Sequence, residues 1–330
     1  MPMRNASIVL FAALAGFETP ALVQSKEPLA VVATIELPNV EGRIDHLAVD
    51  REGQRLFVAA LGNNTLEVVD VRQGRHLQSV KGFQEPQGVA FLPDTKQVAV
   101  ANGQSGELQF LAGDDMHVVS RVKVGDDADN VRYDAAARRL YVGYANGIAA
   151  VSLPDGKPAG SAALAAHAES FQLDPSSAMM YVNVPGARQI AAIDRKAMKV
   201  VATWRTSGAE SNYPMALDAA AKRLFIGCRR PAKILVVDTV SGKVTASADT
   251  IGDTDDVFYD ARRKRLYVSG GEGAVDVLQD QPTGFARVAR IPTAAGARTS
   301  LFVPEFNRLY VAVPHRGAQR AAVMVLEARD

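Results

Sequence analysis

The 330-residue sequence predicts an all-β fold, a seven-bladed β-propeller with four-stranded blades. The first observation is a repeat: an apolar strand core with a central aromatic residue or alanine recurs seven times, at intervals of 40 to 44 residues. The second is that each interval has room for four short strands, which is the content of one propeller blade. The third is that no stretch shows a long helical periodicity. The seven cores are residues 56–58, 98–100, 140–142, 180–182, 224–226, 266–268 and 309–311.

Within each repeat the elements follow the same order. Turn-forming and charged residues, such as 50–55, join a first strand to the core, as expected of an exposed hairpin. After the core, a turn rich in Gly and Asn leads to a third, alternating strand, for example 66–71, and a more polar fourth strand such as 243–248 closes the unit. The first strands, most of which end in an acid or a proline, are residues 47–50, 89–93, 131–134, 171–174, 215–218, 257–260 and 301–304.

The two ends of the chain predict how the ring closes. The seventh repeat stops after its third strand, at 322–326, so its outer strand is missing. An unassigned strand at 31–35 resembles the fourth strand of the sixth repeat, 287–291. We therefore expect the N-terminal strand to complete the last blade, because closure removes the free edges of an open sheet. Residues 30–330 are accordingly predicted to form one propeller domain.

Residues 1–21 have the layout of a secretory signal peptide. Arg4 precedes an apolar run at 8–17 that is too short to span a bilayer, and small residues at 19–21 offer a cleavage site. This predicts a protein exported to the periplasm or secreted; the alternative is an N-terminal extension of a cytosolic protein. No later stretch is long and apolar enough for a membrane helix, so we expect no membrane span. We also expect a monomer.

The composition excludes several classes of function. A net charge of +1 argues against nucleic-acid binding and against a polybasic membrane anchor. Cys228 is the only cysteine, so no intramolecular disulfide can form. Arg229 and Arg230 follow it and would lower the pKa of its thiol if they lie close. The chain carries no GxSxG elbow, Walker loop, HExxH or CxxCH motif.

The strand cores of the LYV type, together with third strands that carry Val-Val-Asp, resemble those of the YVTN-repeat (YncE-like) β-propellers of bacterial envelopes. The resemblance covers about residues 30–326. It implies the propeller architecture alone. It does not imply an activity, because propellers of one architecture serve as enzymes and as binding scaffolds.

The residues that directly precede the first strands predict where a ligand binds. In a propeller the first strand lines the central channel, so these positions should gather at one end of it. They include five acids, whose like charges require a cation, arginine partners or shared protons when they converge. The acids are Asp45, Asp129, Glu169, Asp255 and Asp256.

Three interpretations of these acids remain open. A divalent cation could be held by oxygen ligands from Asp45, Asn130, Glu169 and Asp255, and such ligands favour Ca²⁺ or Mg²⁺ over a transition metal. Nearby histidines would shift that preference towards a transition metal. Alternatively, the acids make turn hydrogen bonds or pair with arginines, or they contact an organic ligand. No cofactor is identified by the sequence alone.

Histidines and arginines complete the predicted site. His46 and His315 are the candidates for general acid/base chemistry, because each departs from the pattern of its repeat. His167 is a candidate ligand-binding residue. The arginines are candidate clamps for carboxylate or phosphate groups, since a guanidinium matches both bidentately. They are Arg188, Arg229, Arg230 and Arg298.

Two functions follow as hypotheses. The first is a ligand- or protein-binding scaffold that uses its channel face to bind a small anionic molecule or an envelope protein. The second is a metal-assisted hydrolase or lyase of the lactonase kind. Aspartates that end the first strands, such as Asp50 and Asp260, are expected to stabilise turns only.

Overall fold

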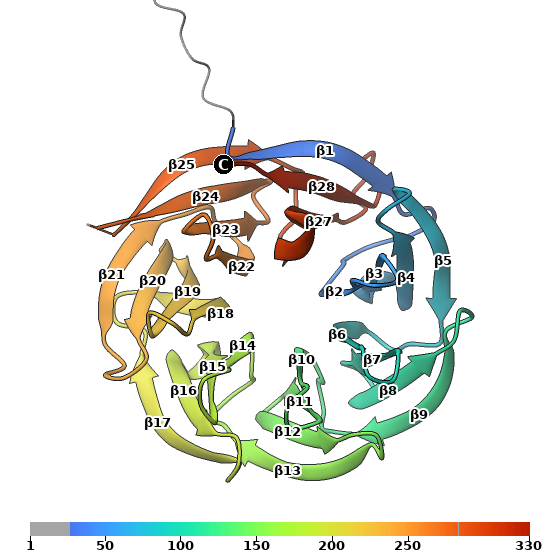
Figure 1. The fold of residues 1–330 in the computed structure, drawn as a ribbon, viewed down its shortest axis with the longest axis horizontal. Helices are drawn as coiled ribbons and strands as arrows, with labels where there is room; N and C mark the ends of the chain where they lie inside the picture. Colours follow the sequence, from blue (N-terminus) through green and yellow to red (C-terminus); the bar gives the residue numbers. More distant parts are fainter. Residues whose placement is uncertain (1–26, 283) are drawn as a thin grey trace, which may run out of the picture.

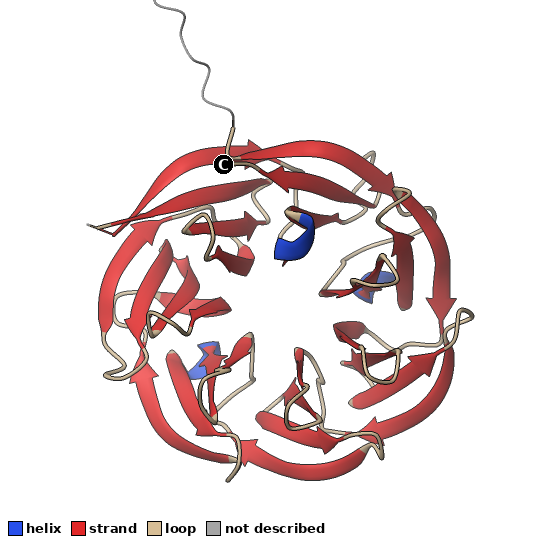
Figure 2. Ribbon diagram, in the orientation of Figure 1, coloured by secondary structure: helices blue, strands red, loops and turns tan. Residues whose placement is uncertain are grey.

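The computed structural model describes residues 27–282 and 284–330, and these form seven four-stranded antiparallel sheets arranged in a ring (Figures 1 and 2). The predicted seven-bladed propeller is therefore confirmed. The predicted signal peptide falls in residues 1–26 and lies outside the described residues. Within the part that is described, no helix has the length and apolar character needed to cross a membrane.

The blades follow the chain order, and the strands of each blade succeed one another from the channel outward. The first three blades are β2 (Leu47–Asp50), β3 (Arg55–Ala60), β4 (Thr65–Asp70) and β5 (Arg75–Lys81); β6 (Pro86–Leu92), β7 (Gln97–Asn102), β8 (Glu107–Ala112) and β9 (His117–Lys123); and β10 (Val131–Asp134), β11 (Arg139–Tyr144), β12 (Gly147–Ser152) and β13 (Lys157–Ala163).

The fourth, fifth and sixth blades continue this pattern. They are β14 (Phe171–Leu173), β15 (Met179–Val184), β16 (Gln189–Asp194) and β17 (Lys199–Arg205); β18 (Glu210–Asp218), β19 (Arg223–Arg230), β20 (Ala232–Asp238) and β21 (Val244–Asp249); and β22 (Thr254–Asp260), β23 (Arg265–Gly270), β24 (Ala274–Gln281) and β25 (Gly284–Pro292). The helical elements of the described residues are short 3₁₀ turns, η1 (Leu61–Asn63), η2 (Pro185–Ala187) and η3 (Pro304–Phe306).

The seventh blade closes the ring as the sequence predicts. It contains β26 (Ser300–Val303), β27 (Arg308–Val313) and β28 (Ala322–Ala328), and β1 (Leu29–Glu36) is its outermost strand. β1 runs antiparallel to β28 from the pair Leu29–Ala328 to the pair Glu36–Ala322. The two strands lie side by side at the rim of the ring (Figure 1). Hydrogen bonds between β1 and β28 thus close the ring and give the seventh blade its fourth strand.

The core lies between neighbouring blades. The central residues of the strand cores are fully buried, as Phe57, Tyr141 and Tyr267 show. Some reach an aromatic ring of another strand: the Tyr267 and Phe302 rings, from the sixth and seventh blades, have centroids 4.9 Å apart. Burying an aromatic side chain removes about 150 to 250 Å² from water. Each blade thus buries the central residue of its strand core, which is an aromatic ring or an alanine.

Aspartates at the ends of the first strands stabilise turns, as expected. The backbone N–H of Gly53 donates to Asp50 Oδ1 at 2.9 Å, and that of Ala137 donates to Asp134 at 3.0 Å. Asp260 accepts the N–H of Arg262 at 3.1 Å. Since these side chains satisfy the turn amides, they are not available for chemistry in the channel.

The innermost strands of all seven blades line the central channel (Figure 1). The residues at and before the beginning of these strands share one end of the channel, because the strands run in the same direction. We call this end the channel mouth. The turns between second and third strands lie at the same end, because strands alternate in direction within a blade.

Candidate functional site

The channel mouth contains a cavity of about 470 Å³, and the predicted column of residues lines much of it. Beneath it lies a chamber of about 20 Å³, which is the size of one water molecule or ion. The lining of the cavity includes Arg43, Gln87, Asp127, Asp129, His167, Glu169, Tyr213, Arg229, Asp255 and Arg298. The chamber is lined by Arg43, Asp45, His46, Asp129, Asn130, Glu169, Ser170, Tyr213 and Asp255.

One wall of the mouth is an acid–histidine cluster made of Asp45, His46, Asp129, His167 and Glu169. His46 Nε2 lies 3.6 Å from Asp45 Oδ1 and also 3.6 Å from Asp129 Oδ1. His167 Nε2 lies 3.5 Å from Asp129 Oδ2 and 4.0 Å from Glu169 Oε1. Asp129 therefore lies between the two imidazoles, with one carboxylate oxygen towards each.

Burial and the charges within this cluster raise the pKa values of Asp45, His46 and Glu169 and lower that of Asp129. Burial raises the pKa of Glu169 to about 8, and the charge of Asp129 adds to the effect. Burial likewise raises the pKa of Asp45. Burial opposes the charged form of His46, but the carboxylates of Asp45 and its neighbours outweigh this and raise its pKa. For Asp129, burial is outweighed by the contact with His167 and by the charge of His46, so its pKa is lowered.

Two buried oxygens at the acid–histidine cluster lack hydrogen-bond partners among the atoms of the described residues. They are Oδ1 of Asp129 and Oδ1 of Asn130. The two residues are 6% and 2% exposed, and both line the small chamber. An unpartnered buried polar atom costs about 1 to 3 kcal/mol, so it needs an explanation such as a bound ion or water.

The other wall is an arginine-paired cluster made of Tyr213, Arg229, Asp253, Asp255 and Arg298. Arg229 donates to Asp255 Oδ1, and Arg298 Nε lies 3.0 Å from Asp255 Oδ2. Arg298 also contacts Asp253 at 3.0 Å. The Arg229 guanidinium lies 3.8 Å from the centre of the Tyr213 ring, a cation–π contact. Asp255 is thus paired with two arginines, as the arginine-pairing interpretation of the acids expects.

Three residues of the predicted site do not line either cavity of the mouth. His315 contacts Glu41, with Nδ1 2.7 Å from the carboxylate. Arg188 pairs with the half-exposed Glu210 at 2.9 Å. Arg230 is exposed and donates to Ser211 at 3.0 Å. The structure therefore brings His46, His167, Arg229 and Arg298 together with the acids, but not these three.

Sequence reasoning misses several residues of the mouth. It places Asp129 in the converging column but does not include it in the predicted set of metal ligands. Arg43 contacts Asp45 at 2.6 Å, and its place two residues before that acid carries no signal of its own. Asp127 contacts His167 at 3.2 Å. The signal that identifies Asp129 is its equivalence to Asp45 in another repeat.

The condition under which Arg229 and Arg230 would lower the pKa of the Cys228 thiol is not met. Cys228 is fully buried among apolar side chains that include Ile190 and Leu224, and burial raises the pKa of its thiol to about 12. Arg229 is the next residue along β19, but its side chain extends to Asp255 instead. Alternation along the strand places the two side chains on opposite faces of the sheet.

Asp256, the fifth acid of the column, faces the interior of the channel, where it lines a separate cavity of about 410 Å³ with His46 and Arg132. Its Oδ2 accepts the backbone N–H of Ser300 at 2.8 Å. Burial raises the pKa of Asp256 to about 7. It therefore belongs to the channel wall and not to either cluster of the mouth.

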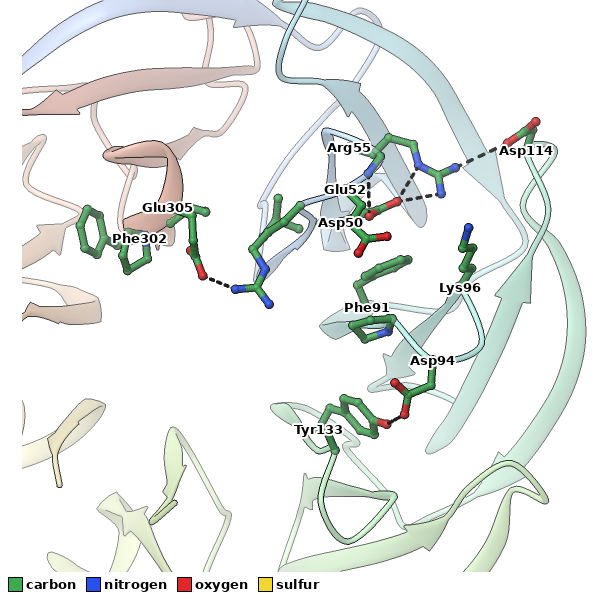
Figure 3. A pocket seen from close by; sticks show the side chains of 17 residues that line it. Asp50, Glu52, Arg55, Phe91, Asp94, Lys96, Asp114, Tyr133, Phe302 and Glu305 are labelled. Carbon is green, nitrogen blue, oxygen red and sulfur yellow. Dashed lines mark hydrogen bonds and ion pairs between the residues drawn. The ribbon is translucent and has the colours of Figure 1, made fainter. Parts of the chain in front are cut away.

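A larger cavity, of about 1190 Å³, opens at the opposite end of the channel, among the turns between first and second strands (Figure 3). Several of its charged side chains form ion pairs or hydrogen bonds. Arg55 reaches Asp50 at 3.1 Å, Arg51 pairs with Glu305, and the Tyr133 hydroxyl donates to Asp94 at 2.6 Å. This cavity is the larger of the two, but the converging acids, histidines and arginines of the channel mouth make that end the candidate site.

No family model and no curated protein sequence matches the chain. Solved structures do match it. A chain of Kuenenia stuttgartiensis hydrazine synthase is similar with a TM-score of 0.74 and 16% identity, over 83% of this chain and 94% of that one. A chain of the mitotic checkpoint complex is similar with a TM-score of 0.78 and 10% identity, over 99% of this chain and 100% of that one. At these identities the similarity shows the propeller fold alone.

The mouth offers two groups of residues that could hold a metal ion. They are Asp45, His46 and Asp129, and Asp129, His167 and Glu169; in each group the ligand atoms lie within 4.8 Å of one another. Asp255, which the sequence placed in the metal site, belongs to neither group, whereas Asn130, which it also placed there, lines the small chamber. Chemically, one wall of the mouth can accept a cation or move protons, while the other presents guanidinium groups that are already paired.

Proposed function

We propose that this chain is an exported binding propeller that takes a small carboxylate- or phosphate-bearing molecule in the channel mouth. The observation that carries the proposal is the cavity of about 470 Å³, which has the size of a small-molecule site and is lined by three guanidinium groups. Those groups belong to Arg43, Arg229 and Arg298. Carboxylates of the acid–histidine cluster repel an anion unless a cation neutralises them, so affinity depends on the occupant of that wall.

Binding can be tested with citrate and inorganic phosphate as probes, by isothermal titration calorimetry on the protein with and without added divalent metal. The variant Arg298→Lys should weaken binding about tenfold, because an ammonium cannot replace a guanidinium fork. Arg188→Lys is the matched control, since that arginine pairs outside the cavity. If the wild-type protein binds neither probe with any added metal, the proposal fails.

Export is the second part of the proposal, and it is supported by the charged, apolar and small residues of 1–21. N-terminal sequencing of the protein recovered from a periplasmic fraction tests it. A mature N-terminus near residue 22 is expected. An intact Met1 in the cytosolic fraction would contradict it.

A metal-assisted hydrolase or lyase is the second candidate function, favoured by the two unpartnered oxygens beside histidines. With a cation bound there, a substrate carbonyl would be polarised, and a histidine of the cluster could move the proton. Hydrolysis of small lactones by the metal-supplemented protein tests this candidate. His46→Ala and His167→Ala should abolish turnover, whereas His315→Ala should keep it, because His315 lies outside the cavity. If the wild-type protein shows no turnover, the enzymatic candidate fails and the binding role remains.

A further inference from the structure

We propose that the chamber beneath the channel mouth binds one divalent transition-metal ion, held by Asp45 Oδ1, His46 Nε2 and Asp129 Oδ1. The inference deepens the proposed function, since it names what neutralises the acidic wall, and it can be tested without any organic ligand. It also changes the predicted ligand set: Asp45 stays, and His46 and Asp129 replace Asn130, Glu169 and Asp255.

The distances in the cluster are those of ligands around an ion. Metal bonds of about 2.0 to 2.2 Å place neighbouring ligand atoms about 3 to 3.5 Å apart. His46 Nε2 lies 3.6 Å from both Asp45 Oδ1 and Asp129 Oδ1. Contacts of that length are too long for hydrogen bonds. The three groups converge without bonding to one another, and a shared ion explains that arrangement.

Unpartnered oxygens provide an independent observation. The Asp129 side chain is 9% exposed, and its Oδ1, the oxygen that faces His46, has no hydrogen-bond partner among the described residues. The side-chain oxygen of Asn130, on the wall of the same chamber, also has no hydrogen-bond partner among the described residues. A volume of about 20 Å³ fits one atom and not an organic group. The chamber therefore presents an ion with oxygen donors that nothing else satisfies.

The acid–histidine wall has fewer arginine partners than the opposite wall. Arg43 pairs with Asp45 at 2.6 Å, but the ion pairs of Asp129 and Glu169 within 4 Å run only to histidines in the described part of the chain. By contrast, Asp255 of the opposite wall is paired with two arginines. One divalent ion supplies the positive charge that arginines supply there.

The donors also select the class of metal. Carboxylates alone suit Ca²⁺ and Mg²⁺, but an imidazole nitrogen suits Zn²⁺, Mn²⁺ and Fe²⁺. His167 contacts the other oxygen of Asp129 at 3.5 Å and so acts as a positioning residue for that ligand. His46 cannot serve as a general base while its Nε2 binds the ion, which leaves His167 as the histidine free to move a proton.

Metal titration of the full chain tests the inference. Protein stripped with EDTA and dialysed is titrated with ZnCl₂, MnCl₂, CaCl₂ and MgCl₂ by calorimetry, and the wild-type protein should bind one equivalent of Zn²⁺ or Mn²⁺. Asp129→Asn and His46→Ala should weaken binding at least about a hundredfold, and His167→Ala by about tenfold, as expected of a positioning residue. Asp253→Asn is the control, because Asp253 is an acid of the arginine-paired cluster that lines neither the cavity nor the chamber, and this variant should bind like the wild type.

Several outcomes would overturn the site. No binding by folded wild-type protein would do so, as would unchanged affinity in Asp129→Asn, or Ca²⁺ and Mg²⁺ binding as tightly as Zn²⁺ and Mn²⁺. A cooperative thermal melt of each metal-free variant establishes that it is folded. Citrate and phosphate are titrated in separate experiments. If the protein binds metal but neither anion, only the proposed function is contradicted. If it binds an anion but no metal, only this metal site is contradicted.

Discussion

Asp129 and Asp255 occupy equivalent positions in two blades, yet their surroundings differ. Asp255 is paired with Arg229 and Arg298. Asp129 lies between two histidines and keeps one oxygen unpartnered. Propeller symmetry brings both acids to the channel mouth, and the loops of neighbouring blades then decide what each acid can do.

One wall of the mouth is therefore a fixed network of ion pairs, whereas the other can change its protonation or bind a metal. An arginine stays charged at every accessible pH, so the arginine-paired cluster is a permanent network. A histidine gains and loses its proton near neutrality and can also bind a metal, so the acid–histidine cluster responds to its environment.

Removing an arginine should have the largest effect. Arg229→Ala deletes the cation–π contact with Tyr213 and one of the two arginine partners of Asp255, so we expect a loss of about 3 kcal/mol in unfolding free energy. Urea unfolding at pH 7 measures it. His167→Ala in the metal-free protein is the comparison and should cost less than half as much. Equal losses would show that the two walls do not differ in this respect.

Metal should stabilise the protein through the acid–histidine cluster alone. At a free Zn²⁺ concentration about 100 times the dissociation constant, we expect a gain of about 2.7 kcal/mol. Thermal melts with Zn²⁺ and with EDTA measure the shift. It should vanish in Asp129→Asn and persist in Asp253→Asn, because Asp253 lines neither cavity of the mouth. Loss of the shift in Asp253→Asn would mean that the arginine-paired cluster takes part in the site.

The contribution of Asp256 to stability should depend on pH. Burial raises the pKa of Asp256 to about 7 in the folded chain, so the native state holds its proton where the unfolded state has lost it. The cost of ionising this carboxyl is absent below about pH 4, grows as pH rises and is complete above pH 7. Asp256→Asn should keep the acceptor for Ser300 and gain about 1 to 2 kcal/mol at pH 9.

Urea unfolding of wild type and Asp256→Asn at pH 4 and pH 9, both in EDTA, measures that gain. The two proteins should agree at pH 4. A stability difference that is the same at both pH values would contradict an ionisation effect and indicate a change in packing.

The smallest effect is expected outside the mouth. Arg188 pairs with Glu210 on the surface, and an exposed pair contributes about 0 to 1 kcal/mol. Arg188→Ala should therefore change the unfolding free energy by less than about 0.5 kcal/mol and leave metal and citrate binding unaltered. Calorimetry and urea unfolding check both. A large effect would require this arginine to act at the cavity, as the sequence alone predicts.

Much of the site could be predicted because it repeats. Asp45, Asp129, Glu169 and Asp255 hold equivalent places before inner strands, so a correct blade register predicts that they converge. His46 stands out because it breaks the pattern of its repeat. Roles are harder to predict: nothing near Asp255 in sequence shows that Arg298, from another blade, reaches it at 3.0 Å. The environment of Cys228 could not be predicted for the same reason, because its burial depends on distant strands.

The sequence by itself determined the seven blades, the order of strands within them and the closure by β1, since alternation, turn chemistry and repeat length are local properties of the chain. Only the tertiary structure decided which acids are neutralised and which are left with histidines. That choice depends on side chains from different blades meeting across the channel, and on how far burial removes them from water, which local sequence does not encode.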